Sequence, residues 1–127
     1  MASANLTASA QGWKRYTLNA YSSQIGASPV LAYVAVPKRG RIVQVKGVQS
    51  GAVTGTSTVA VAVNGGSAIG SLALSMTGGG AGTEFSSTVN TTDAATLNGV
   101  TEDDVISLTP SGATGSATGS FAVVIEV

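Results

Sequence analysis

Ser-Thr-Val-Ala-Val-Ala-Val-Asn-Gly, residues 57–65, indicates most directly how this chain folds. Val59, Val61 and Val63 alternate with smaller residues, and a period of two is typical of a β-strand with one buried face. The Asn-Gly pair at 64–65 favours a hairpin turn, because type I′ turns need a positive φ at both central residues. The stretch therefore predicts a strand that ends in a tight turn.

Strand signals continue on both sides of this stretch. Upstream, one segment covers 30–36 and is closed by Pro37, and a second covers 41–49, with Val43 and Val45 expected on one face. Downstream, the segments are 67–75, 83–89, 104–109 and 116–127, and a phase shift near Gly70 predicts a bulge. With a short strand near 16–21, about eight strands predict an all-β fold, an antiparallel two-sheet sandwich of the jelly-roll kind. Local signals leave the strand order open.

The first 28 residues differ from the rest of the chain. They are polar, lack a sustained period and hold Trp13, Tyr16 and Tyr21, half of the six aromatic residues. We expect an extended N-terminal arm over 1–28 and a β-sandwich domain over 29–127. The arm could dock on a partner, since Trp, Tyr and Arg are favoured interface anchors. Alternatively, it could fold back so that its aromatic rings fill the core.

Composition predicts one small domain that gains stability by association. The chain has 127 residues, of which 43% are hydrophobic but only 5% aromatic and 9% charged. A core built largely from Ala and Val is thin, and small domains of this type are often stabilised by binding partners. We therefore expect an oligomer, with a homotrimer as the first expectation. The longest apolar run, 30–36, is too short to span a bilayer as a helix, so no membrane partner is predicted.

The charges are segregated by sign along the chain although their sum is zero. All basic residues precede all acidic ones: Lys14, Arg15, Lys38, Arg39, Arg41 and Lys46, then Glu84, Asp93, Glu102, Asp103, Asp104 and Glu126. Such a split could create a surface field that guides docking onto an acidic partner, or that pairs the front of one subunit with the back of the next. It could also arise by chance among so few charges.

Residue types that carry catalysis are scarce. The chain has no His and no Cys, and its lysines show no Ser-x-x-Lys spacing. Glu102, Asp103 and Asp104 form the one carboxylate cluster, which we interpret as a turn before the strand at 104–109 in preference to a calcium site. We therefore expect no enzymatic activity, no metal site and no cofactor.

A basic turn lies between the segments 30–36 and 41–49. Its residues Lys38, Arg39 and Arg41 are too few, without aromatic partners, for strong nucleic-acid binding, and no nucleic-acid partner is predicted. The turn is better interpreted as a solvated tip or as a contact to an acidic protein surface.

Three stretches carry a resemblance to a known family. They are Val-Ala-Val-Pro-Lys-Arg-Gly-Arg-Ile-Val at 34–43, Val-Ala-Val-Ala-Val-Asn-Gly at 59–65 and Val-Thr-Glu-Asp-Asp-Val-Ile at 100–106, followed by a Gly/Ser/Thr turn and an apolar strand. In this layout residues 30–127 resemble the small β-sandwich head decoration (cement) proteins of tailed bacteriophages. The acidic triplet 102–104 stands where such proteins often have Gly-Asp, which leaves the shape of that turn open.

The resemblance implies a structural protein of the virion on the outer capsid surface. Its partner would be the major capsid protein, whose neighbouring subunits it would clamp as a trimer. In this family the N-terminal arm often contacts the capsid. For that role the sequence offers Trp13, Lys14, Arg15, Tyr16 and Tyr21, with the basic turn as a further contact. The alternative is a tail, fibre or adhesin-type β-sandwich module that binds host-surface glycans.

Overall fold

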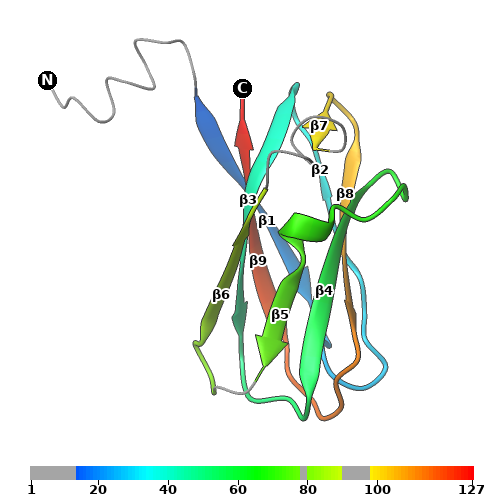
Figure 1. Cartoon of the computed structure of the whole chain (residues 1–127), viewed down its shortest axis with the longest axis vertical. Helices are drawn as coiled ribbons and strands as arrows, with labels where there is room; N and C mark the ends of the chain where they lie inside the picture. Colours follow the sequence, from blue (N-terminus) through cyan, green and yellow to red (C-terminus); the bar gives the residue numbers. More distant parts are fainter. Residues whose placement is uncertain (1–13, 78–79, 90–97) are drawn as a thin grey trace, which may run out of the picture.

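The computed structural model describes residues 14–77, 80–89 and 98–127, which form a two-layer β-sandwich (Figure 1). The strands are β1 (Arg15–Ser22), β2 (Ala32–Ala35), β3 (Gly40–Gln49), β4 (Thr56–Val63), β5 (Leu74–Thr77), β6 (Glu84–Thr88), β7 (Gly99–Val100), β8 (Val105–Ser111) and β9 (Gly119–Glu126). One sheet has the order β1-β9-β3-β6, with β7 paired to β3. The other has the order β2-β8-β4-β5.

The connectivity is that of a jelly roll. Strands pair antiparallel in a nested series, β1 with β9, β2 with β8, β3 with β6 and β4 with β5. This series results when a doubled-over chain wraps into two facing sheets. The predicted all-β, antiparallel, jelly-roll-like sandwich is confirmed, and the structure supplies the strand order that local signals left open.

The core lies between the two sheets and is built mainly from aliphatic side chains. Val59 and Val61 from β4 and Val123 and Ile125 from β9 belong to this core, and all four are fully buried. Phe121 is the one aromatic side chain among the buried core residues that the structure describes. It fits because two glycines lie against it: a Cβ on Gly47 would stand 3.1 Å from the ring, and one on Gly119 2.9 Å.

Strand β3 contains a bulge that the sequence analysis did not predict. The register with β9 shifts between Ile42 and Gln44, so Ile42 and Val45 are buried while Val43 is only half-buried. The expectation that Val43 and Val45 share a face is therefore wrong. The physical reason is Asn98, whose backbone oxygen accepts from the Ile42 N–H and whose Nδ2 donates to the Ile42 carbonyl, each at 2.9 Å.

The Asn64-Gly65 turn forms as predicted, but the chain does not return directly as a strand. Both residues have positive φ, 53° and 69°, and the Gly66 N–H donates to the Val63 carbonyl at 3.0 Å. The chain then makes a 3₁₀ turn, η1 (Gly70–Leu72), and pairs with β4 only from Leu74. The phase shift near Gly70 marks this 3₁₀ turn, not a bulge. Among the described residues, no helix is long and apolar enough to cross a membrane.

Part of the expected N-terminal arm belongs to the sandwich. Residues 15–22 form β1, which pairs with β9 over its whole length, from Arg15 opposite Glu126 to Ser22 opposite Gly119. Ile25, which follows, is fully buried. The domain therefore includes β1 and does not begin at residue 29, because β9 would otherwise lack a partner on that side. Residues 1–13 lie outside the described residues.

Candidate binding surfaces

Charged side chains gather at one end of the sandwich. Strands β1 and β3 flank β9, and their registers place Arg15 and Arg41 opposite Glu126 on either side. Directly opposed residues in adjacent strands point to the same face, so the three side chains form one row. Nε of Arg15 lies 3.2 Å from Oε2 of Glu126, which fixes one side of the row.

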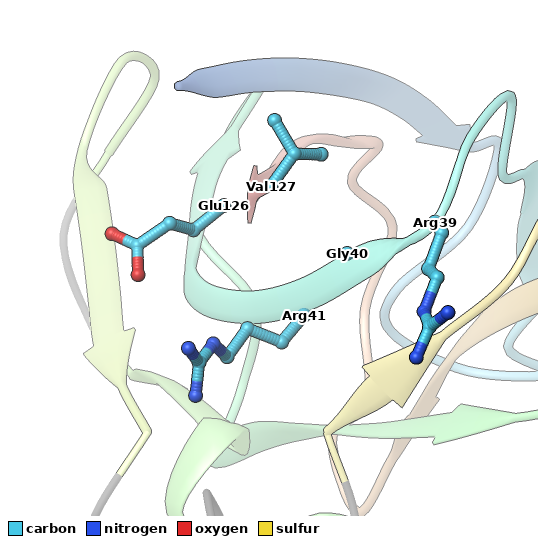
Figure 2. A pocket seen from close by; sticks show the side chains of 5 residues that line it. All are labelled: Arg39, Gly40, Arg41, Glu126 and Val127. Atoms are coloured by element: carbon cyan, nitrogen blue, oxygen red, sulfur yellow. The ribbon is translucent and has the colours of Figure 1, made fainter. Parts of the chain in front are cut away.

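The basic turn lies beside this row. Arg39, Gly40 and Arg41 line an open pocket of about 390 Å³ together with Glu126 and Val127. Figure 2 shows the Arg41 side chain on β3 and the Arg39 side chain on the turn just before that strand, both beside this pocket. Both arginines are exposed, so their guanidinium groups are available to an anionic partner.

Tyr16 connects the N-terminal segment to the basic turn. Its hydroxyl donates to the Lys38 carbonyl at 2.7 Å, and Nζ of Lys38 stands 5.9 Å from the centre of its ring, within cation–π range. Burial raises the pKa of the Tyr16 hydroxyl above its ordinary value. Tyr16 is half-buried and packs against the core, which corresponds to the interpretation in which the segment folds back.

The structure thus brings most of the sequence-predicted contact residues together. Lys14, Arg15 and Tyr16 meet the basic turn at one end, which we call the charged end; the described residues on it are Lys14, Arg15, Tyr16, Lys38, Arg39, Arg41 and Glu126. Tyr21 lies at the opposite end of β1 and is 60% exposed. Trp13 lies outside the described residues.

The acidic turn lies at this same end. The Asp103 N–H donates to the Val36 carbonyl at 2.9 Å, and Val36 stands two positions before Lys38, the first residue of the basic turn. The Asp104 carboxylate accepts from Asn64 Nδ2 at 2.9 Å and from the Thr101 N–H at 2.8 Å, and these hydrogen bonds hold its pKa below the ordinary value. The separation of signs along the sequence is therefore not a separation in space.

The turn interpretation of the acidic triplet is supported by these contacts. Asp103 adopts a positive φ of 73°, and the Asp104 N–H donates to the Thr101 carbonyl at 3.1 Å, closing the turn. Within the described residues, no group of three or more His, Cys, Asp and Glu side chains is placed to hold a metal ion.

A second surface lies on the outer face of the other sheet, and sequence reasoning missed it. Leu31, Tyr33 and Val105 line a pocket of about 430 Å³, closed by the polar residues Asn64 and Ser107 and by Gly65. Tyr33 is 62% exposed, so most of its ring is available for contact. Tyr33 is adjacent to the buried Ala32 in the predicted strand 30–36, so the alternation of the strand would have placed its ring on the outer face.

Comparison with known proteins identifies fold relatives but no family. No protein-family model matches the chain, and no curated protein matches it in sequence. Among solved structures, the acidic stable capsid structure of Helicobacter pylori bacteriophage KHP30 is similar over 91% of this chain and 93% of that one, at 14% identity and a TM-score of 0.50. The CBM36-1 domain of a multidomain xylanase from the hindgut metagenome of Trinervitermes trinervoides is similar over 90% and 97%, at 10% identity and a TM-score of 0.50. At these identities the likeness shows the β-sandwich fold alone.

Proposed function

We propose that this chain is a virion structural protein that decorates and stabilises the outer surface of a phage capsid by binding coat subunits. It acts without catalysis or a cofactor, and as a homotrimer. The observation that carries the proposal is the charged end, where the N-terminal segment and the basic turn form one surface. The resemblance to cement proteins implies capsid contact by the N-terminal arm, and the basic turn is the contact to an acidic protein surface that its own residues predict.

The two exposed arginines at the charged end, Arg39 and Arg41, suit an acidic protein surface. Arg39 and Arg41 are exposed, while Glu126 is occupied by Arg15. Neither guanidinium group forms an ion pair with another described residue, and both, one on β3 and one on the turn before it, can bind carboxylates in the paired geometry that Arg favours. Contacts of this kind speed association and set orientation, and each contributes only about 0.2–1 kcal/mol when exposed. Many copies joined into oligomers multiply such a modest affinity.

The fold also supports the proposal. A jelly roll presents two flat sheets and two sets of loops, and the likeness to the KHP30 capsid structure extends over nearly the whole of both chains. A protein that reinforces a shell needs rigidity and contact area, and this chain contains neither His nor Cys for acid–base or thiolate chemistry.

Co-sedimentation with bare expanded capsids tests the proposal. The wild-type chain is expected to pellet with capsids, and less of it at about 0.5 M than at about 0.05 M salt, because screening weakens exposed charge pairs. Arg39→Gln should weaken binding by about threefold, equivalent to ~0.7 kcal/mol. The matched control is Lys46→Gln, which removes the same charge from the middle of β3 and should bind normally. A wild-type chain that stays in the supernatant contradicts the proposal.

A second candidate function is glycan binding, and one observation favours it. Tyr33 presents an exposed ring beside the side chains of Asn64 and Ser107, which combines a stacking surface with hydrogen-bonding groups. Calorimetric titration with xylan and cellulose oligosaccharides tests this candidate. Binding that Tyr33→Ala abolishes and Tyr21→Ala leaves intact would establish it.

A further inference from the structure

Two Asn-Gly pairs occur in the chain, at 64–65 and 98–99, and both lie in described parts of the structure. An asparagine followed by glycine can deamidate without an enzyme. The backbone nitrogen of the glycine attacks the side-chain Cγ, the amide nitrogen leaves as ammonia with the proton of the attacking nitrogen, and a cyclic succinimide forms. Water then opens the ring at one of its two carbonyls and leaves Asp or isoAsp. Glycine favours the attack because it has no side chain in the way and its backbone is permissive.

The pair at 98–99 is protected on both sides of its peptide bond. Asn98 is only 2% exposed, and its Nδ2 donates to the Ile42 carbonyl at 2.9 Å. Gly99, in β7, pairs with Arg41 of β3, so its backbone belongs to a sheet. A buried asparagine and a glycine in a strand pair must both be released by local opening before the succinimide ring can close.

The pair at 64–65 lies in an open turn. Asn64 and Gly65 are both exposed, and a Cβ on Gly65 would meet nothing within 4 Å. Among the described residues, none accepts a hydrogen bond from the Gly65 N–H. Water therefore reaches this peptide bond, and no hydrogen bond to a described residue holds the nitrogen that would attack.

The Asn64 side chain is the part of this pair that the structure restrains. Its Nδ2 donates to Oδ1 of Asp104 at 2.9 Å, and its Oδ1 accepts from the Val105 N–H at 2.9 Å; we call these two hydrogen bonds the Asn64 clasp. While both are made, the side chain cannot rotate its Cγ onto the Gly65 nitrogen. The reacting conformer is the one in which the clasp is open, so the rate is proportional to the population of that conformer.

Deamidation would convert the clasp into a repulsive contact. The amide nitrogen that donates to Asp104 would be replaced by a carboxylate oxygen, so two negative charges would meet where a hydrogen bond was made. In the isoAsp product the backbone runs through the former side chain and is one carbon longer, which no longer fits a type I′ turn. Either product would loosen the turn and add a negative charge to the pocket that Asn64 and Gly65 line with Tyr33.

We propose that Asn64 is a site of spontaneous deamidation and that Asp104 controls the rate by holding the side-chain amide. The proposal is carried by the contact between these two side chains together with the open glycine that follows Asn64. The change is one-way because the ammonia is lost, so the added charge accumulates with the age of the protein. The inference goes beyond the proposed function and is independent of it, since the reaction needs only the chain and water.

Peptide mapping by mass spectrometry tests the proposal on the full chain, incubated in mildly alkaline buffer below its unfolding temperature. Alkaline buffer is used because the attacking nitrogen must lose its proton. Asp and isoAsp should accumulate at Asn64 and not at Asn98, which reports on global unfolding in the same sample. Asp104→Ala removes one bond of the clasp and should raise the rate at Asn64 by about threefold or more, the ratio that corresponds to one lost hydrogen bond. The matched control is Glu102→Ala, which removes the same charge from the same turn outside the clasp and should leave the rate unchanged.

An exchange of the two side chains keeps the test decisive if Asp104→Ala perturbs the turn. Asn64→Asp reproduces the Asp product and should lower the midpoint of thermal unfolding. Adding Asp104→Asn should restore the midpoint, because an amide at position 104 can donate to a carboxylate at position 64 and still accept from the Thr101 N–H.

Three results would overturn the proposal. They are an Asn64 that stays intact in the wild type, an Asn64 that reacts equally fast in the wild type and in Asp104→Ala, and a double variant no more stable than Asn64→Asp alone.

Discussion

Individual residues control this fold where backbone approaches backbone. The Gly26–Gly115 contact leaves no room for a side chain, and it joins the loop between β1 and β2 to the loop between β8 and β9. The sequence contains 17 glycines, and nothing in their local surroundings distinguishes this one. The contact depends on a partner almost ninety positions away, so pattern reading could not have found it.

Replacing Gly26 by Ala is expected to destabilise the chain by about 1–3 kcal/mol, the usual cost of overpacking, because the Gly115 carbonyl cannot retreat without breaking its hydrogen bond to Ala27. Urea denaturation measures this loss. Gly51→Ala is the control: a Cβ there meets nothing within 4 Å, and stability should stay within about 0.5 kcal/mol of the wild type. Equal stability of the two variants would contradict the close approach.

Asp104 makes stability depend on acid pH. Its pKa is lowered in the folded chain by the hydrogen bonds from Asn64 and Thr101, so the unfolded chain binds a proton more readily. Its stabilising contribution is therefore fully present above the unfolded pKa of about 3.9 and is lost as the pH falls through the folded pKa. Asp104→Asn should lose less stability than the wild type between neutral pH and pH of about 3, measured by urea denaturation at each pH. An unchanged pH dependence would show that these hydrogen bonds do not form.

At the scale of elements, the alternation of apolar and polar residues predicted the strands well. It failed where a neighbouring segment determines the local structure. The segments 41–49, 57–64 and 116–127 correspond to β3, β4 and β9 within a few residues. The 3₁₀ turn before β5 is closed by local hydrogen bonds, and its phase shift was interpreted as a bulge. The bulge at Val43 and the pairing of β7 were missed because each depends on contacts remote in sequence. For the same reason the charged end was predicted as two separate groups, an arm and a turn, and not as one surface.

The bulge in β3 gives a direct test at this scale. Asn98→Ala removes the side-chain donor to the buried Ile42 carbonyl and should destabilise the chain by about 1–3 kcal/mol, the cost of an unsatisfied buried group. Thermal or urea denaturation measures it. Asn19→Ala, at an exposed position of β1, is the matched control and should be nearly neutral. A neutral Asn98→Ala would mean that water replaces the lost donor.

At the scale of the whole molecule, the nested pairing makes the N-terminal segment part of the folded unit. Deleting residues 1–28 removes β1 and Ile25, strips β9 of one neighbour and opens the core. We expect this truncated chain to lose cooperative thermal unfolding. A deletion that ends at residue 13 keeps every described residue and should retain it. Only the shorter deletion therefore tests capsid docking by Trp13 without destroying the sandwich.

The pairing of β1 with β9 also determines how the protein responds to force. The two strands run antiparallel, and Lys14 and Val127 lie side by side, with the Val127 N–H donating to the Lys14 carbonyl at 2.8 Å. Pulling these two residues apart would break the hydrogen bonds between β1 and β9 one after another, starting at this end. A load applied along the strands, from the charged end to the opposite end of the sandwich, would instead shear the hydrogen bonds between β1, β9 and β3 together. We therefore expect the protein to resist force along its strands more strongly than force that separates Lys14 from Val127.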